Sequence, residues 1–478
     1  MALRANHPLS TWLLGLAGCV VASASALPYA GSWNDGSRLA AVESIADRHT
    51  MAIEDSIFCR VPPETLARGC PPYHPNDLNS LTYGTRDKLL INGHFYSDKP
   101  AVISFLMAGF YQMLRWVGLP AAAERPDFFC WALTLASAGA AYVITLLSLH
   151  RLGQLIGLPQ ATHFLWIASF ALCTFALAYT RHVNNHILLL AVLAVMCVQF
   201  IHLRNETENG AASWLRLAAL GTLAGLAFNL DLGSGPLLVV CAFGLVLYRC
   251  RRPSMLGLFL LSVAPWVIAG LGLNYAIGGV WKPMNMVPEY SEWPGSPFTS
   301  ENLTGFARKT PFGMSVYALS LLCGKHGFIV HNLPLLLLLP AMIVVLRRPS
   351  RDRPELIFAL GWCCWTWLTY SVLSNNSAGA CCSIRWFVPF LAPAYYVLGL
   401  YLRDYPQFRP DLMVLSAWGA LLAAIMWWNG PFIVHMVPLL WPTVGSALVC
   451  WLIYRIRSRR PTPFFPAQEE SPRPSVAA

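Results

Sequence analysis

Two short polar segments hold most of the side chains in this sequence that could do chemistry. The first, Asn34 to Arg38, places a carboxylate and a guanidinium three residues apart, at Asp35 and Arg38. The second, His94 to Lys99, contains a His, a Tyr, an Asp and a Lys. A carboxylate of suitable pKa and geometry can take a proton from a hydroxyl group, and Arg and Lys bind phosphate. We therefore expect Asp35 to act as a base and Arg38 and Lys99 to bind a phosphate group.

Each of these residues also has a purely structural reading. Asp35 or Ser37 could cap a helix, which is compatible with a role as base. Lys99 stands next to a proline that opens an apolar helix, where lysines commonly extend to lipid headgroups. Asp98 could pair with Lys99 or bind a metal ion.

The elements that position these segments are apolar helices. Of the 478 residues, 56% are hydrophobic and only 12% are charged, whereas a soluble domain carries roughly a quarter charged residues. The composition predicts an integral membrane protein. The net charge of +10 comes largely from arginines in short loops between apolar runs, which indicates the cytoplasmic bias of basic residues rather than nucleic-acid binding.

The predicted fold is all-α, a polytopic transmembrane bundle of about twelve spans with both termini cytoplasmic. We expect the apolar run 101–119 to lie in the membrane interface, because the arginine loops then all fall on one side. We interpret the run 11–30 as an uncleaved span; the alternative is a signal peptide cut near Ala24-Ser25-Ala26. The other expected spans are 128–149, 162–180, 186–203, 214–230, 235–249, 256–275, 328–346, 355–373, 386–402, 411–428 and 436–454.

A single transmembrane domain, 1–454, is expected to carry two large outer loops. The first, 31–127, follows the first span and contains amphipathic surface helices, one of them over 37–53. The second is 276–327. The tail 455–478 is basic and then rich in Pro and Ser, which predicts a disordered cytoplasmic segment. Cys59 and Cys70 in the first loop are a plausible disulfide in an oxidising compartment, and the sequence leaves that pairing open.

The same topology puts the other polar residues on the outer face and little but arginine on the inner face. Arg385 lies outside against the charge bias, which favours an anionic partner and makes it a third phosphate-binding candidate. Asp231, where a span meets the surface, is either a site residue or a turn residue. Asn184 and Asn185 either close a turn or contact substrate. The candidates for substrate binding are His94, Tyr96, Asp98, Asn184, Asn185, His186, Asp231 and His326.

At these residues the chain resembles the type-C glycosyltransferase superfamily, with bacterial lipid A aminoarabinose transferases and protein O-mannosyltransferases most similar. The resemblance rests on Asp35 after the first span, on Arg38, on the long outer loop, and on Asp98-Lys99-Pro100 opening a helix at the membrane surface. It covers the first third of the chain, and beyond that it is mainly topology. Two departures concern neighbouring positions: the family often has Asp-Glu where this chain has Asp35-Gly36, and Lys-Pro-Pro at Lys99. A third is that the family's second-loop acid is replaced by Asn184 or Asn185.

The resemblance implies an inverting transferase of the hexosyl or pentosyl type at the periplasmic face of a bacterial inner membrane. A polyprenyl-phosphate sugar would be the donor, and a hydroxyl on a lipid, glycan or protein the acceptor. Asp35 would be the base, and Arg38 and Lys99 would hold the donor phosphate. No cofactor is required, since cations can neutralise the leaving phosphate; should a divalent metal take part, Asp98 and His326 are its candidate ligands.

Membrane lipids are the other expected partners, and no nucleic acid is expected. The main alternative is a transporter or flippase of a glycolipid or another anionic substrate, which predicts charged residues in mid-span and broken helices in matching halves. A purely structural or receptor protein is the third reading, and it does not require polar chemistry clustered on one face.

Overall fold

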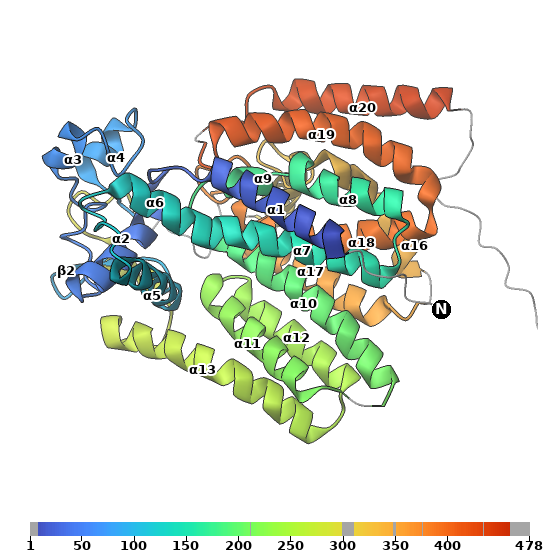
Figure 1. Cartoon of the computed structure of the whole chain (residues 1–478), viewed down its shortest axis with the longest axis horizontal. Coiled ribbons are helices and arrows are strands. Elements are labelled where there is room, and N and C mark those ends of the chain that lie inside the picture. Colours follow the sequence, from blue (N-terminus) through green and yellow to red (C-terminus); the bar gives the residue numbers. More distant parts are fainter. Residues whose placement is uncertain are drawn as a thin grey trace, which may run out of the picture.

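Apolar helices run along the long dimension of the molecule, and a smaller assembly of short elements covers one end (Figure 1). The computed structural model describes residues 8–210, 212–298, 310–347, 350–374, 376–433 and 435–458. The bundle helices are α1 (Pro8–Ser25), α6 (Pro126–Thr134), α7 (Ala140–Ile156), α8 (Gln160–Cys173), α9 (Ala176–Tyr179), α10 (Asn185–Glu208), α11 (Trp214–Leu230), α12 (Gly235–Arg249), α13 (Pro253–Gly278), α15 (Pro311–Cys323), α16 (Leu338–Arg347), α17 (Arg353–Leu373), α18 (Leu391–Asp404), α19 (Arg409–Asn429) and α20 (Leu440–Arg457). Short 3-10 or π turns join several of them: η1 (Leu135–Gly139), η3 (Leu333–Leu337), η4 (Arg385–Phe390) and η5 (Pro406–Phe408).

The all-α membrane architecture is confirmed. Among the described residues, 5 helices are long and apolar enough to cross a membrane: Pro126–Ile156, Asn185–Glu208, Pro253–Gly278, Arg353–Leu373 and Pro406–Asn429. Shorter apolar helices lie beside them, including Trp214–Leu230 and Gly235–Arg249. The count of twelve spans stays a prediction, and so does the assignment of the sides.

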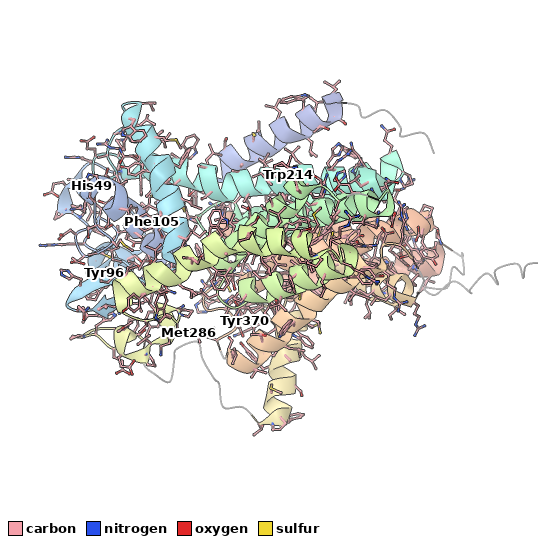
Figure 2. The ribbon with its side chains drawn as sticks, turned by 90° about the horizontal axis from the view of Figure 1, so that it is seen from below. His49, Tyr96, Phe105, Trp214, Met286 and Tyr370 are labelled. Carbon is pink, nitrogen blue, oxygen red and sulfur yellow. The ribbon has the colours of Figure 1, made fainter. Side chains whose placement is uncertain are left out.

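The assembly at the end of the bundle is built from the first predicted outer loop. It contains α2 (Trp33–Arg48), α3 (Pro63–Ala67), α4 (Leu78–Tyr83), β1 (Lys88–Ile91), β2 (His94–Ser97) and α5 (Ala101–Trp116). The second predicted outer loop supplies η2 (Met284–Met286) and α14 (Pro288–Ser291), while its residues 299–309 lie outside the described part. The helix α5 packs on α2 and lies across the end of the bundle, with Phe105 on it and Tyr96 nearby at the same end (Figure 2). The expectation that 101–119 lies in the membrane interface stays a prediction.

The helix α2 differs from the predicted surface helix over 37–53. It starts at Trp33 because Ser32 caps it, and it ends at Arg48 because His49 adopts a left-handed conformation with φ 55. Most of its residues, including Asp35 and Arg38, are buried against α5 and β2. The prediction of a helix lying on the membrane surface was therefore wrong here, since the loop folds over both faces of α2.

The hairpin β1–β2 was not predicted. Its strands pair antiparallel with Lys88 opposite Ser97, and the turn residues Asn92 and Gly93 have φ of 52 and 86. Positive φ at both central residues is the geometry that Asn-Gly favours in tight hairpins. The hairpin brings Ser97 and the residues after it back against α2.

The opposite end of the bundle carries ion pairs rather than arginine alone. Asp352 pairs with Arg204 and, at 3.5 Å, with Arg403, and Glu355 accepts two hydrogen bonds from Arg249 Nη2. The expectation that this face holds little but arginine was wrong, because acidic residues at the start of α17 neutralise several of them. The predicted cytoplasmic tail begins inside α20, which continues to Arg457, and its residues 459–478 lie outside the described part.

Candidate active site

The Asp35 carboxylate belongs to a capping box at the start of α2. Its Oδ1 accepts hydrogen bonds from the amide and the hydroxyl of Ser32, both at 2.8 Å, and its Oδ2 accepts one from the Gly31 amide at 2.7 Å. The N-cap is therefore Ser32 rather than Asp35 or Ser37, and Asp35 takes part in the cap as the third helical residue. A carboxylate oxygen can accept about two hydrogen bonds, so Oδ2 keeps the capacity for one more.

His182 occupies that remaining side of Asp35. Its Nδ1 lies 3.3 Å from Asp35 Oδ2, and both side chains are buried. The distance is that of a charge pair, although the two groups are not aligned for a hydrogen bond. A Cβ on Gly31 would lie 2.5 Å from His182 Nε2, so the absence of a side chain at Gly31 lets the ring approach.

Gly36, one of the departures from the family pattern, is explained by packing. A Cβ at this position would collide with the hydroxyl of Tyr73. Tyr73 is fully buried and donates a hydrogen bond to the Phe58 carbonyl at 2.7 Å. A glutamate in place of Gly36 would displace this tyrosine, so the first loop of this chain is folded around a glycine.

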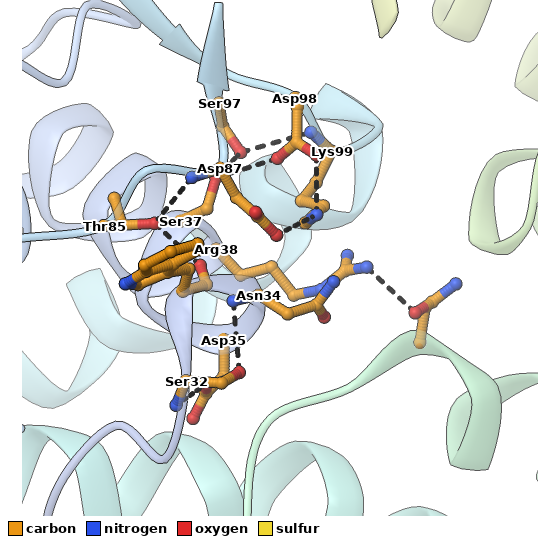
Figure 3. Close-up of polar contacts among 12 residues, drawn as sticks. Ser32, Asn34, Asp35, Ser37, Arg38, Thr85, Asp87, Ser97, Asp98 and Lys99 are labelled. Carbon is orange, nitrogen blue, oxygen red and sulfur yellow. Dashed lines mark hydrogen bonds and ion pairs between the residues drawn. The ribbon is translucent and has the colours of Figure 1, made fainter. Parts of the chain in front are cut away.

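The Arg38 guanidinium extends from α2 toward the start of α10 (Figure 3). Its Nη2 donates to Asn185 Oδ1 at 2.8 Å, and Asn185 in turn donates to the Leu230 carbonyl at 2.7 Å. Burial lowers the pKa of Arg38 to about 10, and the nearby positive charge of Arg385 also acts to lower it. The Nε atoms of Arg38 and Arg385 are both buried without a hydrogen-bond partner among the described residues.

Lys99 lies between two carboxylates rather than free in the site (Figure 3). Its Nζ is 2.8 Å from Asp87 Oδ2 and 2.6 Å from Asp98 Oδ2. Burial raises the pKa of Asp98, and the Asp87 charge raises it further. For Asp87, burial is outweighed by Lys99, Arg385 and Arg38, which together hold its pKa below the usual range. Asp98 is thus the member of this pair that protonates first as the pH falls.

The loops tie this cluster to α2 through hydroxyl groups. Ser37 Oγ lies 2.7 Å from Ser97 Oγ and donates to Asp98 Oδ1 at 3.2 Å. Thr85 donates to the Trp33 carbonyl at 2.7 Å, which anchors the segment that leads to Asp87. Both segments that hold Lys99 are therefore fixed to the first turns of α2.

Asp231 forms a second buried carboxylate centre near the same cations. Its Oδ1 accepts hydrogen bonds from Tyr370 Oη at 2.8 Å and from the Ser234 amide at 2.8 Å, and its Oδ2 is 3.2 Å from His186 Nδ1. Burial opposes its ionisation, but these partners outweigh burial and hold the pKa of Asp231 below the usual range. Both the site reading and the turn reading of Asp231 fit this geometry. Tyr370 stacks on Trp386, with ring centroids 4.2 Å apart.

Four of the predicted candidates make other contacts. Asn184 caps α10 by accepting a hydrogen bond from the Ile187 amide, so its turn reading is confirmed. His94 is exposed and lies 2.6 Å from Glu54. Tyr96 pairs with Leu89 in the hairpin, and the His326 carbonyl accepts a hydrogen bond from Ser383 at 3.1 Å.

Three residues that complete the site were not among the predicted ones: Asp87, His182 and Tyr370. His182 belongs to the polar run Arg181–His186, and that run was a usable signal. Tyr370 lies in an apolar helix with no local signal.

A disulfide and a metal centre were the remaining open questions. Cys59 and Cys70 are free thiols in this structure. Within the described ranges, no three His, Cys, Asp or Glu side chains are grouped so that they could hold a metal ion. Asp98 uses one carboxylate oxygen to bind Lys99. The role of a divalent metal stays a prediction.

The geometry as a whole gathers residues from distant segments at one end of the bundle. Arg38, Lys99 and Arg385 supply positive charge. Asp35, Asp87, Asp98 and Asp231 supply four carboxylates, one more than the three cations. Unpartnered guanidinium N–H groups in a buried setting are costly, and an anion with several acceptor oxygens would satisfy them. The arrangement can hold an anion next to a buried carboxylate.

The fold is shared with membrane glycosyltransferases of the type-C superfamily. The chain superposes on the crystal structure of ArnT from Cupriavidus metallidurans bound to undecaprenyl phosphate, with a TM-score of 0.50 and 13% identity over 94% of this chain and 76% of the other. The apo oligosaccharyltransferase of Archaeoglobus fulgidus gives a TM-score of 0.44 and 10% identity over 91% of this chain and 56% of its own. No protein-family model and no curated protein matches the sequence. The resemblance inferred from the first loop is confirmed at the level of fold.

Proposed function

We propose that this protein is a membrane glycosyltransferase that moves a sugar from a polyprenyl-phosphate donor to an acceptor hydroxyl. The observation that carries the proposal is the pair of guanidinium groups of Arg38 and Arg385, whose Nε–H groups are buried and lack partners in the described part of the chain. The two arginines lie far apart in the sequence. In the folded chain, Arg385 is near enough to lower the pKa of Arg38. A phosphate oxygen is the acceptor that such groups bind best. The fold is that of a protein crystallised with undecaprenyl phosphate.

In the proposed reaction the acceptor oxygen attacks the anomeric carbon from the side of Asp35. The Asp35 carboxylate takes the hydroxyl proton, the bond between the anomeric carbon and the phosphate oxygen breaks, and the anomeric configuration inverts. Polyprenyl phosphate leaves with its new negative charge held by Arg38, Lys99 and Arg385, so no general acid is needed. The capping hydrogen bonds fix the Asp35 carboxylate before the acceptor arrives, which is the preorganisation that catalysis needs.

The proposed location is the outer face of a bacterial inner membrane, with the arginine-rich end of the bundle in the cytoplasm. A transporter is less well supported, since the ion pairs of Arg204, Arg249 and Asp411 lie near helix ends rather than in mid-span. The transferred sugar is a hexose or a pentose, and the missing mass in the experiment below identifies it.

The test compares envelope glycolipids, glycans and glycoproteins by mass spectrometry in three strains. One lacks the gene, one is restored with the wild type, and one is restored with Asp35→Asn. We expect one sugar to disappear in the first strain, to return with the wild type, and to stay absent with Asp35→Asn. If Asp35→Asn restored the sugar fully, the assignment of Asp35 as the base would be wrong. An unchanged envelope in the strain without the gene would contradict the proposed activity, and transport assays would follow.

A further inference from the structure

A groove lies between α12 and α17 at the arginine-rich end of the bundle, and none of its lining residues belongs to the candidate active site. Its volume is about 670 Å³, within the roughly 300–1,000 Å³ of typical ligand sites. The lining includes Tyr248 and Arg249 of α12 and Arg353, Ile357 and Trp365 of α17.

The groove has the length of one membrane leaflet. Arg353 and Trp365 lie twelve positions apart on one helix, or about 18 Å at about 1.5 Å per residue. Half of a hydrocarbon core of about 30 Å is about 15 Å. A chain that begins at the arginines and follows α17 to Trp365 therefore crosses one leaflet and no more.

Two glycines keep the groove open for such a chain. Gly244 on α12 and Gly361 on α17 both line it. A Cβ built on either would meet nothing within 4 Å. The exposed rings of Tyr248 and Trp365 and the exposed side chain of Ile357 supply its apolar surface.

The mouth of the groove carries positive charge that the protein does not neutralise. Arg249 is paired with Glu355, whereas the side chains of Arg351 and Arg353 are exposed and form no ion pair with a described residue. Glu208 adds one carboxylate to the lining, which leaves the mouth positive overall. Basic pockets between transmembrane helices on this side of a membrane bind anionic lipid headgroups.

We infer that this groove binds an anionic glycerophospholipid from the leaflet at the arginine-rich end, with its phosphate at Arg351 and Arg353 and one acyl chain between Gly244 and Gly361. This lipid would be a structural or regulatory partner. The inference does not depend on the proposed glycosyl transfer, because the residues of the groove and of the candidate active site are different.

Native mass spectrometry of the purified full-length protein tests this directly. Phosphatidylglycerol and phosphatidylcholine with identical acyl chains are added at equal concentration, and bound lipid is counted. We expect phosphatidylglycerol to be retained in preference. Equal retention of the two lipids, or displacement of phosphatidylglycerol by an equal concentration of inorganic phosphate, would overturn the proposal.

Paired variants separate this groove from a generally basic surface. Arg351→Ala with Arg353→Ala should weaken phosphatidylglycerol binding roughly thirtyfold, at about fivefold per arginine. Arg251→Ala with Arg252→Ala is the matched control, since both side chains are exposed at the same end and do not line the groove. An equal loss in the control pair would contradict a specific site.

The Gly361→Leu variant tests whether an acyl chain binds in the groove, and it does so without changing the charge at the mouth. The leucine side chain would project into open groove space, so the thermal unfolding midpoint should stay near that of the wild type while lipid binding is lost. Wild-type binding in this variant would show that no acyl chain lies between the helices and would overturn the proposal.

Discussion

Asp35 Oδ2 and His182 Nδ1 lie 3.3 Å apart in a buried contact between the first turn of α2 and the segment that precedes α10. The first turn of α2 fixes the carboxylate, and Gly31 allows the imidazole to approach it. The buried imidazole lies against the carboxylate on the side that the capping hydrogen bonds leave, so it fixes the orientation of Asp35. This contact makes His182 a positioning residue for the proposed base.

The first prediction concerns this pair. His182→Ala should lower kcat by on the order of a hundredfold, because a misplaced reacting group costs about that much. The affinity for the donor should stay near the wild-type value. His182→Asn should recover part of the activity, since its amide can still reach Asp35. Turnover and prenyl-phosphate binding, measured separately across pH, check this.

The matched control is His49→Asn at the other end of α2. His49 is exposed and has a left-handed backbone that Asn tolerates. It should keep wild-type turnover. A His182→Ala enzyme with wild-type kcat and an unchanged pH profile would exclude the positioning role.

The sequence was sufficient to predict the bundle and the segments that meet at its end. The lengths of the apolar runs predicted the helices, and the placement of 101–119 in the membrane interface stays a prediction. Arg38 and Lys99 were identified by their types and places in the loop. These signals are local in the sequence, so they can be recognised without knowledge of the tertiary structure.

The remaining errors arise where local signals compete or are absent. Asn92-Gly93 is a strong hairpin signal. It lies in the loop 31–127, for which the sequence analysis predicted surface helices and no strands. Ser32 was a helix-cap signal that would have moved the start of α2 to Trp33. The contact between Tyr370 and Asp231 joins residues 139 positions apart, and no local pattern specifies such a contact.

The second prediction is a pH dependence set by Asp98. Lys99 is shared by Asp87 and Asp98, so a donor phosphate must compete with two carboxylates for it. Because the pKa of Asp98 is raised, Asp98 takes up a proton as the pH falls toward that raised value, and Lys99 then has only Asp87 as an ionised partner. Donor affinity should therefore increase as the pH decreases, until the donor phosphate itself is protonated.

Asp98→Asn should bind prenyl phosphate more tightly at neutral pH and show a flatter pH dependence. Asp87→Asn is the comparison: it keeps Asp98, but it removes the charge that helps to raise the pKa of Asp98, so the pH dependence should remain and move to lower pH. Titration calorimetry at several pH values distinguishes the two. A wild-type pH dependence in Asp98→Asn would exclude Asp98 as the titrating group.

The third prediction concerns the support of Arg38. Asn185→Leu removes the amide oxygen that accepts from Arg38 Nη2 at 2.8 Å. Hydrogen bonds to charged groups contribute about 1.5–3 kcal/mol, so prenyl-phosphate affinity should fall about tenfold or more. Arg38→Lys should also lose affinity, because an ammonium cannot reproduce the guanidinium fork. Asn209→Leu, at the exposed far end of α10, is the control and should bind normally. Equal affinity in Asn185→Leu and Asn209→Leu would show that Asn185 does not position Arg38.

The last prediction separates two roles of the stacked pair Tyr370 and Trp386. Tyr370→Phe keeps the ring stack but removes the hydroxyl that donates to Asp231 at 2.8 Å. It should lower the free energy of unfolding by about 1 kcal/mol and leave prenyl-phosphate affinity unchanged, because Asp231 retains its backbone donors. Trp386→Leu removes the ring that stacks on Tyr370 and holds the backbone next to Arg385 in place. This variant should therefore weaken prenyl-phosphate binding. If both variants lower affinity equally, the phosphate site depends on the ionisation of Asp231 rather than on the placement of Arg385, and the hydroxyl of Tyr370 then belongs to the binding site itself.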